Sequence, residues 1–138
     1  MKAQKEAQCQ CGALTAEVED GLKPVTIMCH CVECQRRSGS PFGTIAYFPK
    51  DKVAIAGEAK EYTRETDSGS SFTTGFCPTC GSTVYAFPAR MPNIVGVTVG
   101  AFADNAFPPP QFSVFEQSSH GWVTVPPSVQ RHPRGRDS

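Results

Sequence analysis

Seven cysteines in three groups are the residues of this 138-residue sequence whose types and spacing could do chemistry. The densest group is Cys29-His30-Cys31-Val32-Glu33-Cys34, which places three thiols within six residues. These thiols are too close along the chain for ordinary disulfides, which need Cα atoms about 4.4–6.8 Å apart and suitable Cβ directions. Zinc binds thiolates at about 2.3 Å and accepts them from short turns. Three thiolates leave one tetrahedral position free, and a free position is typical of a catalytic zinc.

The other four cysteines form two close pairs, Cys9/Cys11 and Cys77/Cys80. Four thiolates are the composition of a closed, structural zinc site, and a glycine after the second pair permits a tight turn. We therefore predict two zinc ions per chain, one structural and one catalytic, although spacing alone leaves swapped pairings open. One alternative is a single four-cysteine zinc with three spare buried cysteines. A disulfide framework is disfavoured because the cysteine count is odd and no export signal precedes it.

Composition excludes several classes of partner. Thirteen basic residues balance thirteen acidic ones, so no charge excess indicates nucleic acid or an acidic membrane surface. The first residues lack the apolar run of a signal peptide, and no stretch reaches the ~18 apolar residues of a membrane span. We expect a cytoplasmic protein with reduced thiols and a small-molecule partner; the oligomeric state is left open. Its length predicts one domain. We place this domain over residues 7–125 and a polar tail over 126–138, of which the last residues, 131–138, are expected to be frayed.

Twelve glycines and twelve prolines, with few long periodic runs, favour a mainly β fold of short antiparallel strands and one short helix. Alternating or apolar segments predict strands at 13–19, 25–31, 43–48, 53–55, 61–64, 71–76, 82–87, 94–99, 112–115 and 122–125. The helix is predicted over 32–38, with Gly39 as its stop signal. The loop at 88–92 is expected to overhang the site.

Three residues beside the dense cysteine group have two interpretations each. On an extended segment His30 points away from Cys29 and Cys31, which favours a packed histidine over a fourth ligand unless the backbone bends. Arg36 and Arg37 would flank the metal, where a guanidinium can grip a substrate carboxylate through two hydrogen bonds. The alternative is that both arginines are solvated surface charges.

A three-thiolate zinc has a chemistry different from that of a four-thiolate zinc. Its net charge is minus one instead of minus two, so it is the better Lewis acid, and its free position can take an incoming thiol. Such a site suits making or breaking a bond between a thiol sulfur and a carbonyl carbon. No serine triad, carboxylate pair or phosphate loop competes in the sequence.

The order of the cysteine motifs resembles that of the glutathione-dependent formaldehyde-activating enzyme family, which includes centromere protein V. The motifs are Cys9-x-Cys11-Gly12, then Cys29-His30-Cys31-x-x-Cys34-Gln35-Arg36-x-x-Gly39, then Phe76-Cys77-x-x-Cys80-Gly81-Ser82. The resemblance runs from about residue 7 to 125, through Val97-x-Val-Gly-Ala-Phe-Ala-Asp104 and Trp122. It implies a β-tent zinc fold, a structural zinc on Cys9, Cys11, Cys77 and Cys80, and a catalytic zinc on Cys29, Cys31 and Cys34.

The activity that the resemblance implies is S-(hydroxymethyl)glutathione synthesis or a related carbon–sulfur lyase reaction. The competing class is a non-catalytic zinc module that binds other proteins, as the centromere member implies. A chromatin-binding module would carry a basic patch or arm, and the neutral charge balance disfavours it. A binding module would also leave an open three-thiolate zinc without a role.

Overall fold

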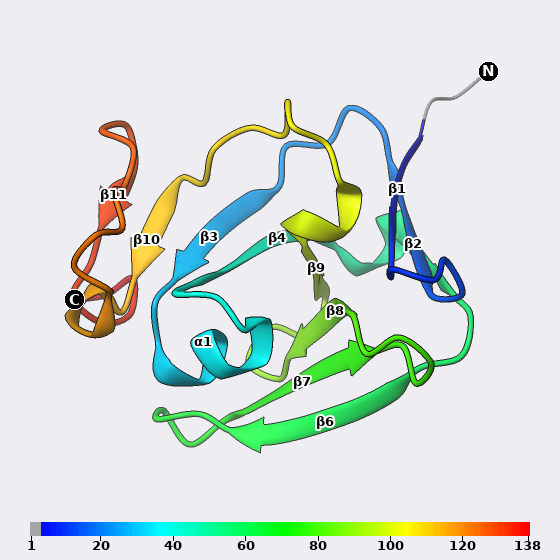
Figure 1. Ribbon diagram of the computed structural model, residues 1–138, viewed down its shortest axis with the longest axis horizontal. Helices are drawn as coiled ribbons and strands as arrows, with labels where there is room; N and C mark the ends of the chain where they lie inside the picture. Colours follow the sequence, from blue (N-terminus) through cyan, green and yellow to red (C-terminus); the bar gives the residue numbers. More distant parts are fainter. Residues whose placement is uncertain (1–3) are drawn as a thin grey trace.

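Two β-sheets form the framework of the protein in this computed structural model, which describes residues 4–138 (Figure 1). The smaller sheet is antiparallel, with β2 in the middle; its strands are β1 (Gln4–Gln8), β2 (Thr15–Glu19) and β5 (Val53–Ala56). The larger sheet has the order β11-β10-β3-β4-β9-β8-β7-β6. Its strands are β3 (Val25–Cys29), β4 (Gly43–Pro49), β6 (Lys60–Glu65), β7 (Ser71–Phe76), β8 (Thr83–Pro88), β9 (Ile94–Thr98), β10 (Phe112–Val114) and β11 (Gln130–Arg131).

The described residues contain a single α-helix, α1 (Val32–Ser38), and three short 3-10 helices, η1 (Lys50–Lys52), η2 (Val99–Phe102) and η3 (Glu116–Ser118). Helix α1 ends where the sequence predicts, because Gly39 adopts a left-handed conformation (φ 67°) and its N–H donates to the carbonyl of Gln35. The prediction of a mainly β zinc-binding fold with one short helix is confirmed. None of the helices described here is long and apolar enough to cross a membrane.

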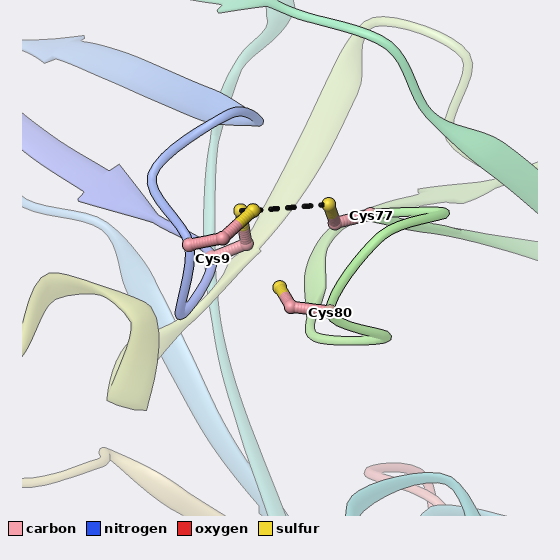
Figure 2. A group of neighbouring side chains, drawn as sticks. Cys9, Cys77 and Cys80 are labelled. Atoms are coloured by element: carbon pink, nitrogen blue, oxygen red, sulfur yellow. Dashed lines mark hydrogen bonds between the residues drawn. The ribbon is translucent and has the colours of Figure 1, made fainter.

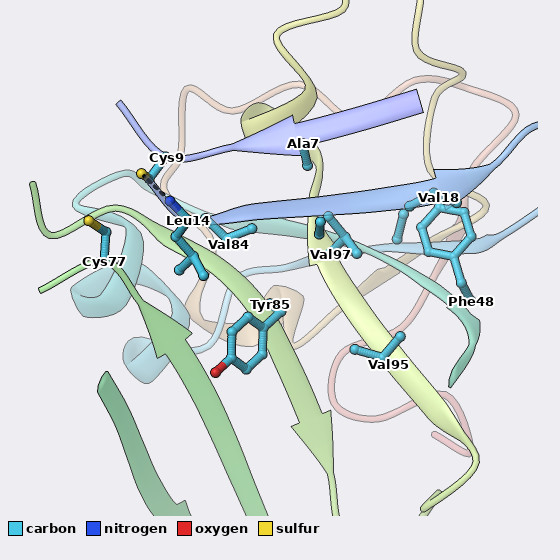
Figure 3. Packing of buried hydrophobic residues seen from close by; sticks show 12 residues of the cluster. Ala7, Cys9, Leu14, Val18, Phe48, Cys77, Val84, Tyr85, Val95 and Val97 are labelled. Atoms are coloured by element: carbon cyan, nitrogen blue, oxygen red, sulfur yellow. Dashed lines mark hydrogen bonds between the residues drawn. The ribbon is translucent and has the colours of Figure 1, made fainter. Parts of the chain in front are cut away.

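The hydrophobic core lies between the small sheet and the central strands of the large one (Figure 3). Leu14, Ala16 and Val18 are fully buried and point from the β2 side, as the alternating pattern predicts. Strand β9 supplies Val95 and Val97 from the opposite layer, which confirms that its apolar sequence belongs in the centre of a sheet. The core thus fixes the turn between β1 and β2 against the turn between β7 and β8.

Three features of the topology differ from the expectations. Strand β1 was not predicted, because its sequence Gln-Lys-Glu-Ala-Gln is polar and its extended form depends on pairing with β2. Residues 122–125 form no strand; Trp122 lies in a turn with 74% of its surface exposed. The pairing is not purely antiparallel either, because β10 runs parallel to both β3 and β11.

The expectation of a frayed tail is also wrong. Strand β11 pairs with β10, and Val129 and His132 are buried. The division of the chain at residue 125 remains a prediction. The loop at 88–92 does not overhang the site: it follows β8, whose other end carries the Cys77–Cys80 turn, and lines neither hollow described below.

Candidate metal centres and the adjoining pocket

Two β-hairpin turns bring four cysteines together (Figure 2). The turn between β1 and β2 carries Cys9 and Cys11, and the turn between β7 and β8 carries Cys77 and Cys80. All four Sγ atoms lie within 4.8 Å of one another. The Sγ of Cys11 is 3.7 Å from that of Cys9 and 3.6 Å from that of Cys77. The structure therefore groups these cysteines as the sequence predicts.

The separations fit a metal ion and not a disulfide. A disulfide bond is about 2.05 Å long. Four sulfurs around a tetrahedral zinc with bonds of about 2.3 Å lie about 3.8 Å apart, close to the separations found here. Backbone N–H groups of Leu14 and Thr79 point at Cys9 Sγ (3.2 Å) and Cys77 Sγ (3.4 Å), which stabilises thiolates in both turns. The donor set matches a soft-ligand cation such as zinc.

The thiols of this four-cysteine cluster differ in their pKa. Hydrogen bonding, first from the Ser82 hydroxyl, lowers the pKa of Cys80 to about 5. The pKa of Cys11 is raised to about 11 because thiols of Cys77 and Cys9 outweigh a stabilising backbone hydrogen bond. The Cys80 thiolate is thus present at neutral pH before any cation binds, and a bound cation would lower the pKa of the other thiols as well.

The second cluster, Cys29, Cys31 and Cys34, lies where β3 ends and α1 begins. Its three Sγ atoms also lie within 4.8 Å of one another. Cys31 is the N-cap of α1, and its Sγ accepts the backbone N–H of Cys34 at 3.3 Å. Hydrogen bonds from Cys29 and Cys34 lower the pKa of Cys31 to about 2, while hydrogen bonds with Cys31 and Cys34 raise that of Cys29. The cluster holds a thiolate and presents a three-sulfur face to a cation.

His30 is buried and turned away from this cluster. Its Nε2 lies 2.9 Å from the hydroxyl of Ser113, and its ring is 5.8 Å from that of Phe42. No nitrogen of His30 joins the group of three sulfurs. The interpretation of His30 as a packed histidine, not a ligand, is therefore the one that the structure supports.

A hollow of about 390 Å³ opens beside Cys34. It lies between α1 and strands β6, β7 and β8, and its lining includes Phe72, Phe76 and three arginines, Arg36, Arg37 and Arg64. Glu33 is the single acidic residue of the lining. An apolar wall with an excess of positive charge beside a thiol cluster fits a ligand that carries carboxylates.

The two predicted substrate-binding arginines both line this hollow, in different ways. Arg36 is exposed, whereas Arg37 is half-buried and its Nε has no hydrogen-bond partner. Arg37 fits there because Gly43 on β4 has no side chain; a Cβ on that residue would strike the guanidinium. Their role in substrate binding remains a prediction, and an unpartnered Nε is a donor available to a ligand.

Arg64 is a candidate that sequence reasoning missed. It lies on β6, thirty residues beyond Cys34, and its guanidinium stacks over Phe72 with 5.4 Å to the ring centroid. Its charge contributes to lowering the pKa of Cys31. No local motif marks Arg64, because its position depends on the pairing of β6 with β7 and on the packing of α1 against the sheet.

A second hollow, of about 840 Å³, adjoins the first. The two share Arg37, Gly81 and Thr83, and the second extends past Cys9 towards the proline-rich segment 108–110. Its only charged lining residue is Arg37. The two hollows together form a trough that passes both cysteine clusters.

Fold and site together define a mainly β protein with two cysteine clusters that can each hold a metal ion. The sequence profile of the glutathione-dependent formaldehyde-activating enzyme family matches residues 4–118, and the chain belongs to that family. A crystal structure of a protein from Rhodobacter sphaeroides shares the fold, with a TM-score of 0.56 and 24% identity over 75% of this chain and 91% of that one. A comparison with functionally curated proteins finds no significant match.

Proposed function

We propose that the protein is a zinc-dependent enzyme that forms or cleaves the carbon–sulfur bond of thiol–aldehyde adducts, with S-(hydroxymethyl)glutathione as the reference substrate. The observation that carries the proposal is the juxtaposition of a three-thiol cluster and an arginine-lined hollow at Cys34. Family membership supports the same chemistry. In this proposal zinc is held by Cys29, Cys31 and Cys34 in the catalytic site and by Cys9, Cys11, Cys77 and Cys80 in the structural one.

The reaction needs no redox partner. In the forming direction the thiol sulfur attacks the aldehyde carbon, the C=O π electrons move to oxygen, and the thiol proton ends on that oxygen. A bound zinc would supply Lewis acidity at the open position of the three-cysteine cluster. The chain itself supplies orientation: Arg37 and Arg64 bind carboxylates of the thiol substrate, and Phe72 and Phe76 exclude water from one side of the hollow.

The four-cysteine cluster has a different role in the proposal. It joins two hairpins, and none of its four cysteines lines the arginine-lined hollow. Four thiolates fill a tetrahedral zinc, which leaves no position for substrate. A reducing compartment such as the cytoplasm fits seven free thiols, and the partner is a small thiol or its adduct.

Exchange NMR on glutathione mixed with formaldehyde tests the proposal directly. The zinc-loaded protein should accelerate exchange between free glutathione and its hydroxymethyl adduct, and Cys34→Ser should abolish the acceleration while remaining folded by circular dichroism. A panel of other thiols and aldehydes extends the test beyond glutathione. If the loaded protein accelerates none of them, the enzyme proposal fails, and salt-dependent retention on DNA then tests the binding-module alternative.

A further inference from the structure

The peptide that links the first two cysteines of the three-cysteine cluster is held from outside the cluster. Between the end of β3 and the start of α1, His30 donates its backbone N–H to the carbonyl of Val114 (3.0 Å). Its carbonyl accepts a hydrogen bond from Nε2 of Gln35 (2.9 Å), which also donates to the carbonyl of Ser118 (3.1 Å). Both faces of this short connection therefore depend on residues 114–118 and on α1.

The His30 ring is fixed by a buried chain of hydrogen bonds. The Ser113 hydroxyl donates to Oε2 of Glu116 at 2.6 Å, so its oxygen accepts from His30 Nε2–H at 2.9 Å. His30 and Ser113 are both fully buried. The ring can rotate only by leaving its Nε2–H without a partner in the interior, which is unfavourable.

Residues beyond the family match hold the far end of this chain. Arg131 on β11 donates from Nε to both carboxylate oxygens of Glu116, at 2.9 and 3.0 Å. Phe115 adopts a left-handed conformation (φ 57°), which turns Glu116 back towards Ser113. The N–H of His132 donates to the Ser113 carbonyl at 2.9 Å and closes the arrangement. Strand β11 thus supports the cysteine cluster through the side chains of Glu116, Ser113 and His30.

We propose that Ser113 and Glu116, supported by Arg131, are positioning residues that hold Cys29 and Cys31 at the spacing a metal requires. The proposal rests on the metal-binding role of the three-cysteine cluster proposed above. His30 lies between the two cysteines, so a movement of its ring and backbone moves both sulfurs. None of these three residues belongs to the group of three sulfurs or lines either hollow, so in this proposal they act through His30.

The test uses Co²⁺ as the probe, because thiolate-to-cobalt absorption reports on cysteine sites without turnover. The 138-residue protein should bind Co²⁺ at two sites, and competition with a chelator should give the affinity of each. Ser113→Ala should weaken the weaker, three-cysteine site about tenfold or more and change its absorption, as removal of outer-shell hydrogen bonds does in metal proteins. The four-cysteine site should keep its affinity. Glu116→Gln should keep the Co²⁺ affinity and absorption of the wild-type protein, because the amide oxygen of Gln can still accept a hydrogen bond from Ser113.

Glu61→Gln is the matched control. Glu61 accepts a hydrogen bond from the Tyr85 hydroxyl at 2.7 Å, and β6 directs it away from the face that carries Arg64. The control should leave both Co²⁺ affinities unchanged. If Ser113→Ala does not fold, Arg131→Met replaces it, since that side chain is 63% exposed; it should weaken the same site.

An unchanged affinity and spectrum of the three-cysteine site in the folded variant overturns the proposal. An equal loss at both sites also overturns it, since that would indicate general destabilisation. Failure of the proposed function gives a different result. The wild-type protein would bind two Co²⁺ ions and the variants would change the three-cysteine site as predicted, but the zinc-loaded wild-type protein would not accelerate thiol–aldehyde exchange.

Discussion

Cysteine substitutions in the two clusters should differ in their effect on stability. A metal that bridges Cys11 and Cys77 closes a chain loop across 66 residues, as a disulfide would. The chain-entropy relation for such a loop gives about 4 kcal/mol. A metal on the cluster at residues 29–34 closes a loop of only five residues, for which the relation gives about 2 kcal/mol. Helix α1 already orders part of that short loop through the Cys31 cap.

The expected outcome is a large thermal effect in one cluster and a smaller one in the other. A domain of this size has a stability of about 5–15 kcal/mol, so losing about 4 kcal/mol removes a large fraction of it. With about 4 °C per kcal/mol, Cys77→Ser should lower the melting temperature by about 15 °C. Cys34→Ser should lower it by less than about 8 °C by the same conversion. Both variants should lose about one zinc per chain.

Cys11→Ser separates loss of metal from loss of packing. Cys77 is buried in the core, whereas Cys11 is exposed, so serine at position 11 disturbs little apolar packing. If the metal crosslink is what stabilises the fold, Cys11→Ser should match Cys77→Ser in melting temperature and in zinc content. Thermal melts in excess zinc and in chelator give the comparison. A protein that unfolds on Cys34→Ser but tolerates Cys11→Ser and Cys77→Ser would refute the assignment of roles.

Three further outcomes are expected. Metal analysis after desalting should find two zinc ions per chain, and a chelator should remove the ion of the three-thiol cluster first, because fewer thiolates hold it; one zinc with three freely titrating thiols would contradict this. Arg64→Met should raise KM for a carboxylate-bearing thiol about tenfold to a hundredfold, the effect of about 1.5–3 kcal/mol for a charged hydrogen bond, and leave KM for 2-mercaptoethanol unchanged. Burial and the Glu61 carboxylate raise the pKa of Tyr85 to about 12 from 10, so stability should be complete below pH 10 and fall as the pH rises towards 12; urea melts of Tyr85→Phe should lack this alkaline loss.

Short sequence patterns predicted the parts of the fold that depend on neighbouring residues, such as the end of α1 and the alternation of β2. Gly39 ends α1 because a left-handed residue there needs no Cβ penalty, and the alternation around Ala16 marks a half-buried strand wherever it pairs. The grouping of the cysteines could be predicted from their spacing. Two close pairs supply the four ligands of a closed site, and the remaining three cysteines lie within six residues of one another. These features depend on a few neighbouring residues, and the structure keeps them.

Long-range pairing produced what the sequence did not reveal. Strand β1 has one buried apolar side chain, Ala7, so its extended form comes from hydrogen bonds to β2. Arg64 reaches the three-cysteine cluster because β6 pairs with β7 at the edge of the large sheet. Strand β11 forms because its backbone pairs with the free edge of β10, and the polar Gln-Arg sequence of β11 does not indicate a strand. Each case needs the order of strands in space, which residue spacing does not encode.

The brace on β11 has a consequence for the growing chain on the ribosome. The thiols of Cys29, Cys31 and Cys34 leave the ribosome early, and the four-cysteine set is complete once Cys80 has emerged. Arg131 follows about fifty residues later, which at roughly 5–20 residues per second is a delay of about 3–10 s. During that interval the nascent chain presents a soft-metal cluster without its brace. With the roles proposed above, metal binding by the three-cysteine cluster is expected to be a late event, completed only when β11 pairs with the edge of the sheet.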